Sequence, residues 1–385
     1  MKKEMYSSEV TLLRDTFRRL LRRHAKTNIV KLIDKTHPSD LAQIFRYFND
    51  TEQDLIFSSM LPSEETVKFL YELDESIATR LIESETADRL AKIMEEASSN
   101  EQAFLMGLVS DDFASSVIDL LQAEEQEELE EMMAYPEDSA GILMYTDVFT
   151  LHEETKAREA IYALQDQEDA EMVFYLYTLD DDGRLTGVIS LRDLVTTPSE
   201  TMLKDIMSKN IQAVRPETDQ EEVARIVSQY NFLAVPVVDA SEKLLGIVTV
   251  DSVVDVIREE ATEDFLQLAG AGKDREILLK SSWENARIRL PWLFASWIGG
   301  ILAAFIIGVF DNILESAIAL AAFIPVIIGM GGNVGTQSST IIVRGLATGR
   351  VSFENSIKVL FKEMRVGLIL GSLYGVLLGV FAIFQ

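Results

Sequence analysis

The sequence predicts a multi-domain membrane protein: an all-α superhelical N-terminal domain, a duplicated α/β region, a long connecting helix, and an α-helical transmembrane domain with three spans. Three observations lead to this prediction. Apolar residues recur at helical spacing from 29 to 133, a strand–turn–strand–helix block occurs twice, and three long charge-free stretches fill the C-terminal third. The predicted boundaries are 1–134, 135–203, 204–256, 257–280 and 281–385.

The composition limits the chemistry of the chain. Its 385 residues include 35 basic and 63 acidic residues and no cysteine. The lack of cysteine excludes disulfides, thiol nucleophiles and cysteine-bound zinc, but it leaves hard cations with oxygen ligands. The net charge of -28 argues against nucleic acid as a partner. The segment 36–272 contains 15 basic and 52 acidic residues, so bound cations would reduce the strong electrostatic repulsion within it.

The first 134 residues read as short helices behind a basic N-terminal helix. Apolar residues fall at three- and four-residue spacing, and Ser, Asp, Thr or Asn repeatedly stands where a helix would begin. This pattern predicts a bundle or superhelix of short helices.

Residues 175–195 and 234–254 superpose at an offset of 59, with Asp180 on Asp239 and Gly187 on Gly246. Each copy reads as a strand, an Asp-centred turn, a strand and a helix, and another helix precedes each copy. The region is therefore an internal duplication.

The second copy runs without Pro or Gly into a long helix that Gly270 and Gly272 are expected to end. Carboxylates four residues apart share one face of this helix, with two more beside them: Asp251, Asp255, Glu259 and Glu263, then Glu260 and Asp264. Like charges at this spacing weaken a helix. Either bound cations offset them, or the face is simply solvated.

The charge-free stretches cover 290–310, 317–343 and 366–385, and each is long enough to cross a bilayer. Basic residues before the first stretch and between the second and third place the N-terminal part in the cytoplasm and the first connection outside. The protein is then a multi-pass protein of the cytoplasmic membrane. The alternative is three buried helices of a soluble domain.

The second stretch carries an unusual polar motif. Pro325 and four glycines, Gly329, Gly331, Gly332 and Gly335, are expected to break or thin the helix and expose carbonyl oxygens. Asn333 and Gln337 add side-chain oxygens four residues apart, which could hold a hydrated Mg2+ ion. The alternative is that the glycines allow close helix packing.

At this point the chain resembles the MgtE family of magnesium transporters. The matching segments are HPSDLA at 37–42, YPEDSAGILM at 135–144, TDQEEVARIV at 218–227, EEATEDFLQLAG at 259–270 and PVIIGMGGNVGTQSSTIIVRGLATG at 325–349. The resemblance implies an N-terminal helical domain, a tandem CBS pair, a connecting plug helix and a homodimeric pore. It implies a transporter rather than an enzyme.

The resemblance also implies that intracellular Mg2+, bound among acidic cytoplasmic residues, holds the pore closed. The implied metal-binding residues are Asp255, Glu260, Glu263, Asp264, Asp219, Glu221 and Asp111, and Asp251 and Glu259 lie on the same acidic face. The family leads us to expect Asp where Ser115, Asn231 and Ser252 stand. Fewer carboxylates would weaken binding of a hard dication.

The family has five membrane helices, with a selectivity carboxylate on the fifth, whereas three spans without Asp or Glu are predicted here. Three explanations follow: the chain is truncated, a separate chain supplies the missing membrane helices, or the protein does not transport. The alternative function is a non-conducting Mg2+-sensing or regulatory membrane protein.

A nucleotide is a further candidate ligand. Ser190 and Asp193, with Arg192 between them, fit the pattern by which CBS copies hold a ribose and phosphate, so ATP could bind there. The second copy has Thr249 but Ser252 in place of Asp, which predicts at most one nucleotide site per chain. The alternative is that Asp193 caps the following helix.

Overall fold

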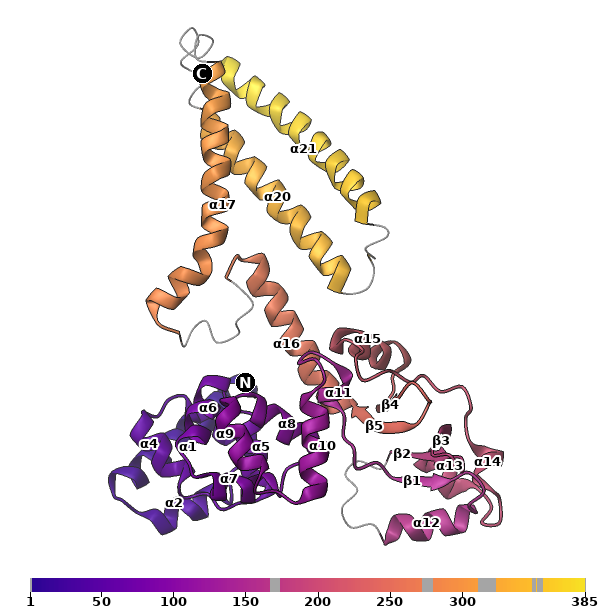
Figure 1. The fold of residues 1–385 in the computed structure, drawn as a ribbon. Helices are drawn as coiled ribbons and strands as arrows, with labels where there is room; N and C mark the ends of the chain where they lie inside the picture. The colour runs from indigo at the N-terminus through magenta and orange to yellow at the C-terminus, as the bar shows by residue number, and fades with distance from the viewer. Residues whose placement is uncertain are drawn as a thin grey trace. The chain divides into compact units, whose positions relative to one another are not determined.

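The computed structural model describes residues 2–166, 174–271, 280–310, 323–347, 351 and 356–384. Contacts along the chain separate two compact units, Met1–Val256 and Ile257–Gln385. The first unit holds a helical region followed by two small α/β modules, and the second holds the long apolar helices (Figure 1).

The helical region contains eleven helices among the described residues. They are α1 (Lys2–Arg22), α2 (Lys26–Ile33), α3 (Pro38–Phe45), α4 (Asp50–Phe57), α5 (Glu64–Tyr71), α6 (Glu75–Glu83), α7 (Ala87–Met94), α8 (Ser99–Gly107), α9 (Asp111–Ile118), α10 (Ala123–Met133) and α11 (Ala140–Leu143). Alternate helices pack on one another: α1 on α3, α3 on α5, α5 on α7, and α7 on α9. Short helices stabilised by neighbours match the expected pattern.

Local sequence signals start these helices as expected. Asn49 and Ser98 each form a reciprocal capping box with the Glu three residues later, and Pro38 occupies the first position of α3. Two buried amides play matching roles: Gln53 and Gln102 each donate to a carbonyl eight residues earlier, at 3.1 and 2.8 Å. Both amide donors are thereby satisfied inside the core.

The duplicated region forms two modules with matching hairpins. The first contains β1 (Thr150–His152), α12 (Ala157–Gln165), β2 (Tyr175–Leu179), β3 (Leu185–Ser190), α13 (Leu191–Thr196) and α14 (Leu203–Ile206). The second contains α15 (Gln220–Tyr230), β4 (Ala234–Val238), β5 (Leu244–Thr249) and the start of α16 (Val250–Leu268). β1 pairs parallel to β2, whereas β2–β3 and β4–β5 are antiparallel.

The predicted offset of 59 holds in the backbone. Tyr175 lies opposite Ser190 in one hairpin, and Ala234 lies opposite Thr249 in the other. Asp180 accepts backbone N–H groups two and four residues later at 2.9 and 2.8 Å, and Asp239 does the same at 2.8 Å for both. The Asp-centred turns and the internal duplication are therefore confirmed.

α16 begins directly after β5 and ends at Gly270. The Gly270 N–H donates to the Gln267 carbonyl at 2.9 Å, and the Ala271 N–H donates to the Leu266 carbonyl at 2.9 Å. With a φ of +67° at Gly270, this is a Schellman motif. Gly270 ends the helix as predicted, whereas Gly272 lies outside the described residues.

The second unit contains three long helices among its described residues: α17 (Ser282–Val309), α20 (Ile324–Ala347) and α21 (Ser356–Phe384). Two segments, Ser282–Val309 and Ile357–Phe384, are long and apolar enough to cross a membrane. α20 packs beside α21 (Figure 1). The span predicted at 317–343, which contains α20, stays a prediction. Its polar motif gives α20 a lower hydropathy, and residues 317–322 lie outside the described residues.

The prediction that the motif glycines break the second span is wrong for the described helix. α20 is continuous from Ile324 to Ala347. Glycine costs about 1 kcal/mol relative to alanine in a helix, but it keeps its N–H and can complete the hydrogen-bond ladder. Pro325 lies in the first turn, where the missing N–H has no intrahelical partner to lose.

The helices also begin earlier than the charge-free stretches. α17 starts at Ser282 rather than 290, with Ser281 and Glu284 forming a capping box, and α21 starts at Ser356 rather than 366. Charged residues occupy the first turns of both helices, so counting uncharged residues shortens the elements. As a result, the helix of the third predicted span contains a carboxylate, Glu363.

Candidate functional site

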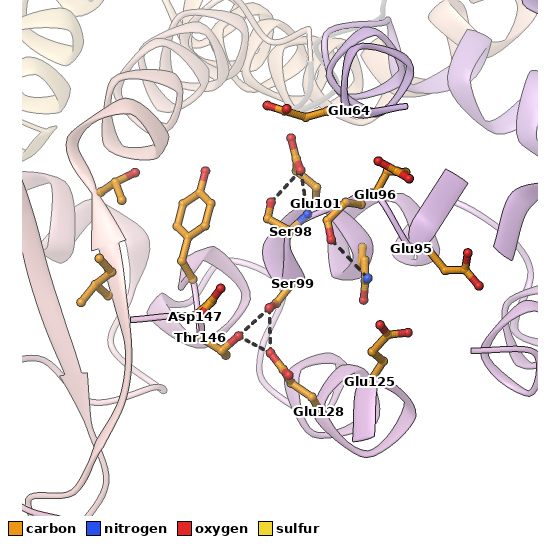
Figure 2. A pocket seen from close by; sticks show the side chains of 15 residues that line it. Glu64, Glu95, Glu96, Ser98, Ser99, Glu101, Glu125, Glu128, Thr146 and Asp147 are labelled. Carbon is orange, nitrogen blue, oxygen red and sulfur yellow. Dashed lines mark hydrogen bonds between the residues drawn. The ribbon is translucent and has the colours of Figure 1, made fainter. Parts of the chain in front are cut away.

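The first unit contains an acidic cavity. It has a volume of about 540 Å³ and lies where α8 and α10 meet the segments around Tyr145 and Ile247. Fifteen residues line it: Glu64, Glu95, Glu96, Ala97, Ser98, Ser99, Glu101, Gln102, Glu125, Glu128, Tyr145, Thr146, Asp147, Ile247 and Thr249 (Figure 2). Seven of these carry carboxylates and none is basic, so the cavity attracts cations and repels anions.

A hydrogen-bond network crosses one wall of this cavity. The Ser99 hydroxyl of α8 donates to Glu128 of α10 at 2.7 Å, and Thr146 bonds both residues (Figure 2). Thr146 belongs to the segment that enters the first α/β module. The network therefore ties the start of that module to the helical region through a charged acceptor.

The cavity is not a preformed metal site. No group of three or more Asp, Glu, His or Cys side chains among the described residues is arranged to hold a metal ion. Figure 2 shows the labelled carboxylates around the cavity rather than converging on one point. A hard dication needs several oxygens at about 2.0–2.6 Å, so an ion here would require water ligands or side-chain movement.

The structure keeps the predicted acids of α16 on one helix. Asp251, Asp255, Glu259 and Glu263 follow one another at successive turns, with Glu260 and Asp264 alongside. Asp251 is exposed and the other five are half-buried. Glu263 accepts a hydrogen bond from the Gln267 amide at 2.7 Å. The acidic face predicted from the spacing is therefore present.

The other predicted metal residues lie on different elements. Asp219 caps α15 and accepts the Glu221 N–H at 2.8 Å, and both side chains are exposed. Asp111 occupies the first turn of α9, where the helix dipole favours a carboxylate. Among the described residues, neither the Asp219–Glu221 pair nor Asp111 forms a metal-binding group with the acids of α16.

Two of the three positions where Asp was expected, Asn231 and Ser252, have local explanations. Asn231 adopts φ +54° and ψ +42° at the end of α15, a left-handed conformation that Asn tolerates well. Ser252 is only 6% exposed, and its hydroxyl lies 3.3 Å from that of Thr249, so a carboxylate there would pay a desolvation cost. Ser115 lies exposed on α9, one turn after Asp111.

The two modules differ at the candidate nucleotide position. In the first, the half-buried Ser190 donates a 2.6 Å hydrogen bond to the exposed Asp193, and Ser190 also accepts the Asp193 N–H at 3.1 Å. Ser190, rather than Asp193, is thus the residue that caps α13. Arg192 is exposed beside them. In the second module the corresponding Thr249 and Ser252 are buried.

One buried hydroxyl in the first module lacks a partner. Tyr177 on β2 is 1% exposed, and its hydroxyl has no hydrogen-bond partner among the described residues. Burial is the main reason that the pKa of Tyr177 is raised, so the phenol stays neutral.

On α20 the motif side chains share a face. Asn333 and Gln337 are four residues apart, and both are exposed within this chain. A Cβ atom added at Gly329, Gly331, Gly332 or Gly335 would meet nothing within 4 Å. Among the described residues of one chain, these glycines therefore make no close contact with another helix, and they leave the surface of α20 without side chains at these positions.

Two groups of polar residues were missed by sequence reasoning. The cavity acids and Thr146 come from segments far apart in the chain, so no local pattern reveals them. Glu363 was excluded from the third predicted span, yet its carboxylate accepts a hydrogen bond from Ser338, next to Gln337, at 2.8 Å. The sequence signal that could have identified Glu363 is that it is a single acidic residue among the basic residues at the start of α21.

Parts of the chain match three known protein families. Residues 36–138 match the MgtE intracellular N domain, residues 140–200 and 203–259 match CBS domains, and residues 324–385 match a family described as divalent cation transporter.

Similar proteins cover most of the chain. A magnesium transporter MgtE from Thermus thermophilus is 35% identical over 355 residues, covering 89% of this chain and 77% of its own. One from Bacillus subtilis is 31% identical over 353 residues, covering 91% and 78%. The crystal structure of the cytosolic domain of the Mg2+ channel MgtE in complex with ATP has a TM-score of 0.60 and 31% identity, covering 63% of this chain and 99% of that one.

The helical region, the paired CBS modules and the apolar helices together define a membrane cation transporter with a regulatory cytoplasmic part. The MgtE relatives are transporters rather than enzymes. The chain belongs to the MgtE family of magnesium transporters.

Proposed function

We propose that this chain conducts Mg2+ across the cytoplasmic membrane as a homodimer, and that intracellular Mg2+ bound to its cytoplasmic acids closes the pore. The observation that carries the proposal is the polar face of α20, where Asn333 and Gln337 stand on a helix of the cation-transporter region. Side-chain oxygens can hold Mg2+ through its water shell, because this ion gives up water reluctantly.

The proposal includes the arrangement of the chain. Domains at 1–134, 135–203, 204–256, 257–280 and 281–385 would form a superhelical N domain, two CBS copies, a plug helix and a membrane domain with three spans. The basic residues near α17 and α21 support a cytoplasmic N-terminal part.

Growth rescue tests transport. The full chain is expressed in a bacterium that lacks Mg2+ uptake and needs high external Mg2+, and we expect growth at low Mg2+. Asn333→Leu should abolish rescue, whereas Thr340→Val, on the same helix, should not, because the Thr340 hydroxyl bonds its own helix at Thr336. Normal membrane insertion without rescue would favour a non-conducting Mg2+ sensor, or a need for a separate chain.

For gating, the proposed ligands are Asp255, Glu260, Glu263, Asp264, Asp219, Glu221 and Asp111, supported by Asp251 and Glu259. Because these acids lie on α9, α15 and α16, a dication that joins any two elements would stabilise one arrangement over others. A coupling of about 1–3 kcal/mol would be sufficient.

Limited proteolysis of the purified full chain tests gating. We expect millimolar Mg2+ to protect the cytoplasmic part relative to chelator, and Glu263→Gln combined with Asp255→Asn to raise the Mg2+ concentration needed. Glu222→Gln is the matched control, because Glu222 pairs with Arg225 on α15. Identical cleavage with Mg2+ and with chelator would refute Mg2+ gating.

We further propose one ATP site per chain, at Ser190, Arg192 and Asp193. The exposure of Arg192 and Asp193, beside the half-buried Ser190, supports the proposal, since the equivalent Thr249 and Ser252 are buried. In a titration of the purified protein with ATP, Asp193→Ala should weaken binding and Ser252→Ala should not. Equal effects of the two substitutions would contradict it.

A further inference from the structure

Glu363 on α21 is held against the motif helix. Its carboxylate accepts a hydrogen bond from the Ser338 hydroxyl of α20 at 2.8 Å, and both residues are half-buried. One turn later on α21 and one turn earlier on α20, a Cβ built on Gly367 would lie 3.9 Å from Cγ1 of Val334. Val334 and Ser338 thus form the stripe of α20 that meets Glu363 and Gly367 of α21.

The direction of this carboxylate is informative. Glu363 stands in a basic stretch with Lys358, Lys362 and Arg365. Neighbours one or two positions away on a helix point in other directions, so Lys362 and Arg365 do not share its face. An ionisable residue in a membrane helix is costly and is usually functional, with its partner on a facing helix.

The contact lies beside the motif face. Successive residues of an α-helix are about 100° apart, so the Asn333–Gln337 stripe lies one residue around from the Val334–Ser338 stripe. The glycines add no side chains to the packing of α20, whereas this hydrogen bond is a side-chain contact that joins α20 to α21.

We propose that the Ser338–Glu363 hydrogen bond is a positioning contact: it sets the rotation of α20 about its own axis and so directs Asn333 and Gln337 toward the ion path. The inference rests on the proposed transport function for its consequence, but not for its geometry. Glu363 acts through the motif helix and does not itself bind the ion.

Substitutions separate hydrogen bonding from charge. Ser338→Ala and Glu363→Ala remove the bond, whereas Ser338→Thr keeps the hydroxyl and Glu363→Gln keeps an acceptor oxygen without the charge. Thr340→Val is the matched control, since it removes a hydroxyl that bonds only within α20 in the described structure. Removing an interhelical hydrogen bond of this kind shifts the equilibrium between the packed and displaced helix positions by about threefold to tenfold.

The first measurement needs no transport. The chain has no cysteine, so Asn333→Cys gives a single labelling site in the purified full protein. We expect Ser338→Ala and Glu363→Ala to change the labelling rate by a water-soluble thiol reagent about threefold to tenfold, and Ser338→Thr, Glu363→Gln and Thr340→Val to leave it nearly unchanged. An unchanged rate in both alanine variants would overturn the proposal.

The second measurement is Mg2+ uptake with Asn333 intact. We expect the alanine variants to lower the maximal rate and the Gln and Thr variants to restore it. If Glu363→Gln is as damaging as Glu363→Ala, the charge is what matters, and the positioning role is wrong. If the unsubstituted chain does not transport while the labelling pattern holds, the proposed function fails and the positioning contact stands.

Discussion

Gly270 ends α16 in a conformation and a space that suit only glycine, which allows a quantitative prediction. Its φ is +67°, and a Cβ atom added there would lie 2.5 Å from Cδ1 of Trp292. For Gly270→Ala, the left-handed conformation costs about 1–2 kcal/mol. Displacement of the indole ring adds about 1–3 kcal/mol, as overpacking usually does. The expected loss is about 2–5 kcal/mol in the local stability of the helix end.

Hydrogen exchange of the full chain in detergent micelles measures this loss. The Gly270 and Ala271 amides close the last turn, so their exchange reports its opening. Since 1.4 kcal/mol corresponds to a factor of ten, we expect exchange at least about 30-fold faster.

Trp292→Ala separates the two costs, because it removes the ring but not the backbone strain. In that background Gly270→Ala should cost only about 1–2 kcal/mol. Gly300→Ala is the control, because a Cβ there meets nothing within 4 Å on helix α17. Unchanged exchange in Gly270→Ala, or the same cost with and without the indole, would refute the reasoning.

Three other predictions concern the first unit. Tyr177→Phe removes an unpaired buried hydroxyl and should raise the free energy of unfolding by about 1 kcal/mol in urea titrations; a loss of stability would contradict this. Thr146→Val should lower it by about 1–2 kcal/mol, because it leaves the network around Glu128 incomplete, whereas Thr196→Val on exposed α13 should change it little. The Arg184 backbone N–H lowers the pKa of Asp180, so this stabilisation is present above the ordinary value of 3.8 and is lost as pH falls through the lowered pKa. Asp180→Asn should therefore flatten the acid unfolding curve of the first CBS copy, and an unchanged curve would contradict the assignment.

The sequence was most informative where structure depends on local signals. The offset of 59 predicted matching hairpins because each copy repeats its own turn residue, Asp180 or Asp239, with the same backbone bonds. The end of α16 at Gly270 was likewise readable, since one residue type satisfies the left-handed position.

Tertiary features were beyond local patterns. Pro325 and the glycines of α20 were expected to break or thin it. Each glycine lowers helix stability without removing a hydrogen bond, and the helix is not broken. The start of α21 was placed too late because charges were treated as the end of a span, which hid Glu363. Its bond to Ser338 joins residues 25 positions apart, so it could not be seen in any window of sequence.

The direct passage from β5 into α16 has a mechanical consequence. No loop separates Thr249 from Val250, so the backbone passes from the strand directly into the 19-residue helix. Such a helix is about 28 Å long, so a tilt of about 5° at its root would swing its tip by about 2 Å. The length of the helix therefore multiplies any tilt at its first turn into a larger displacement at its last.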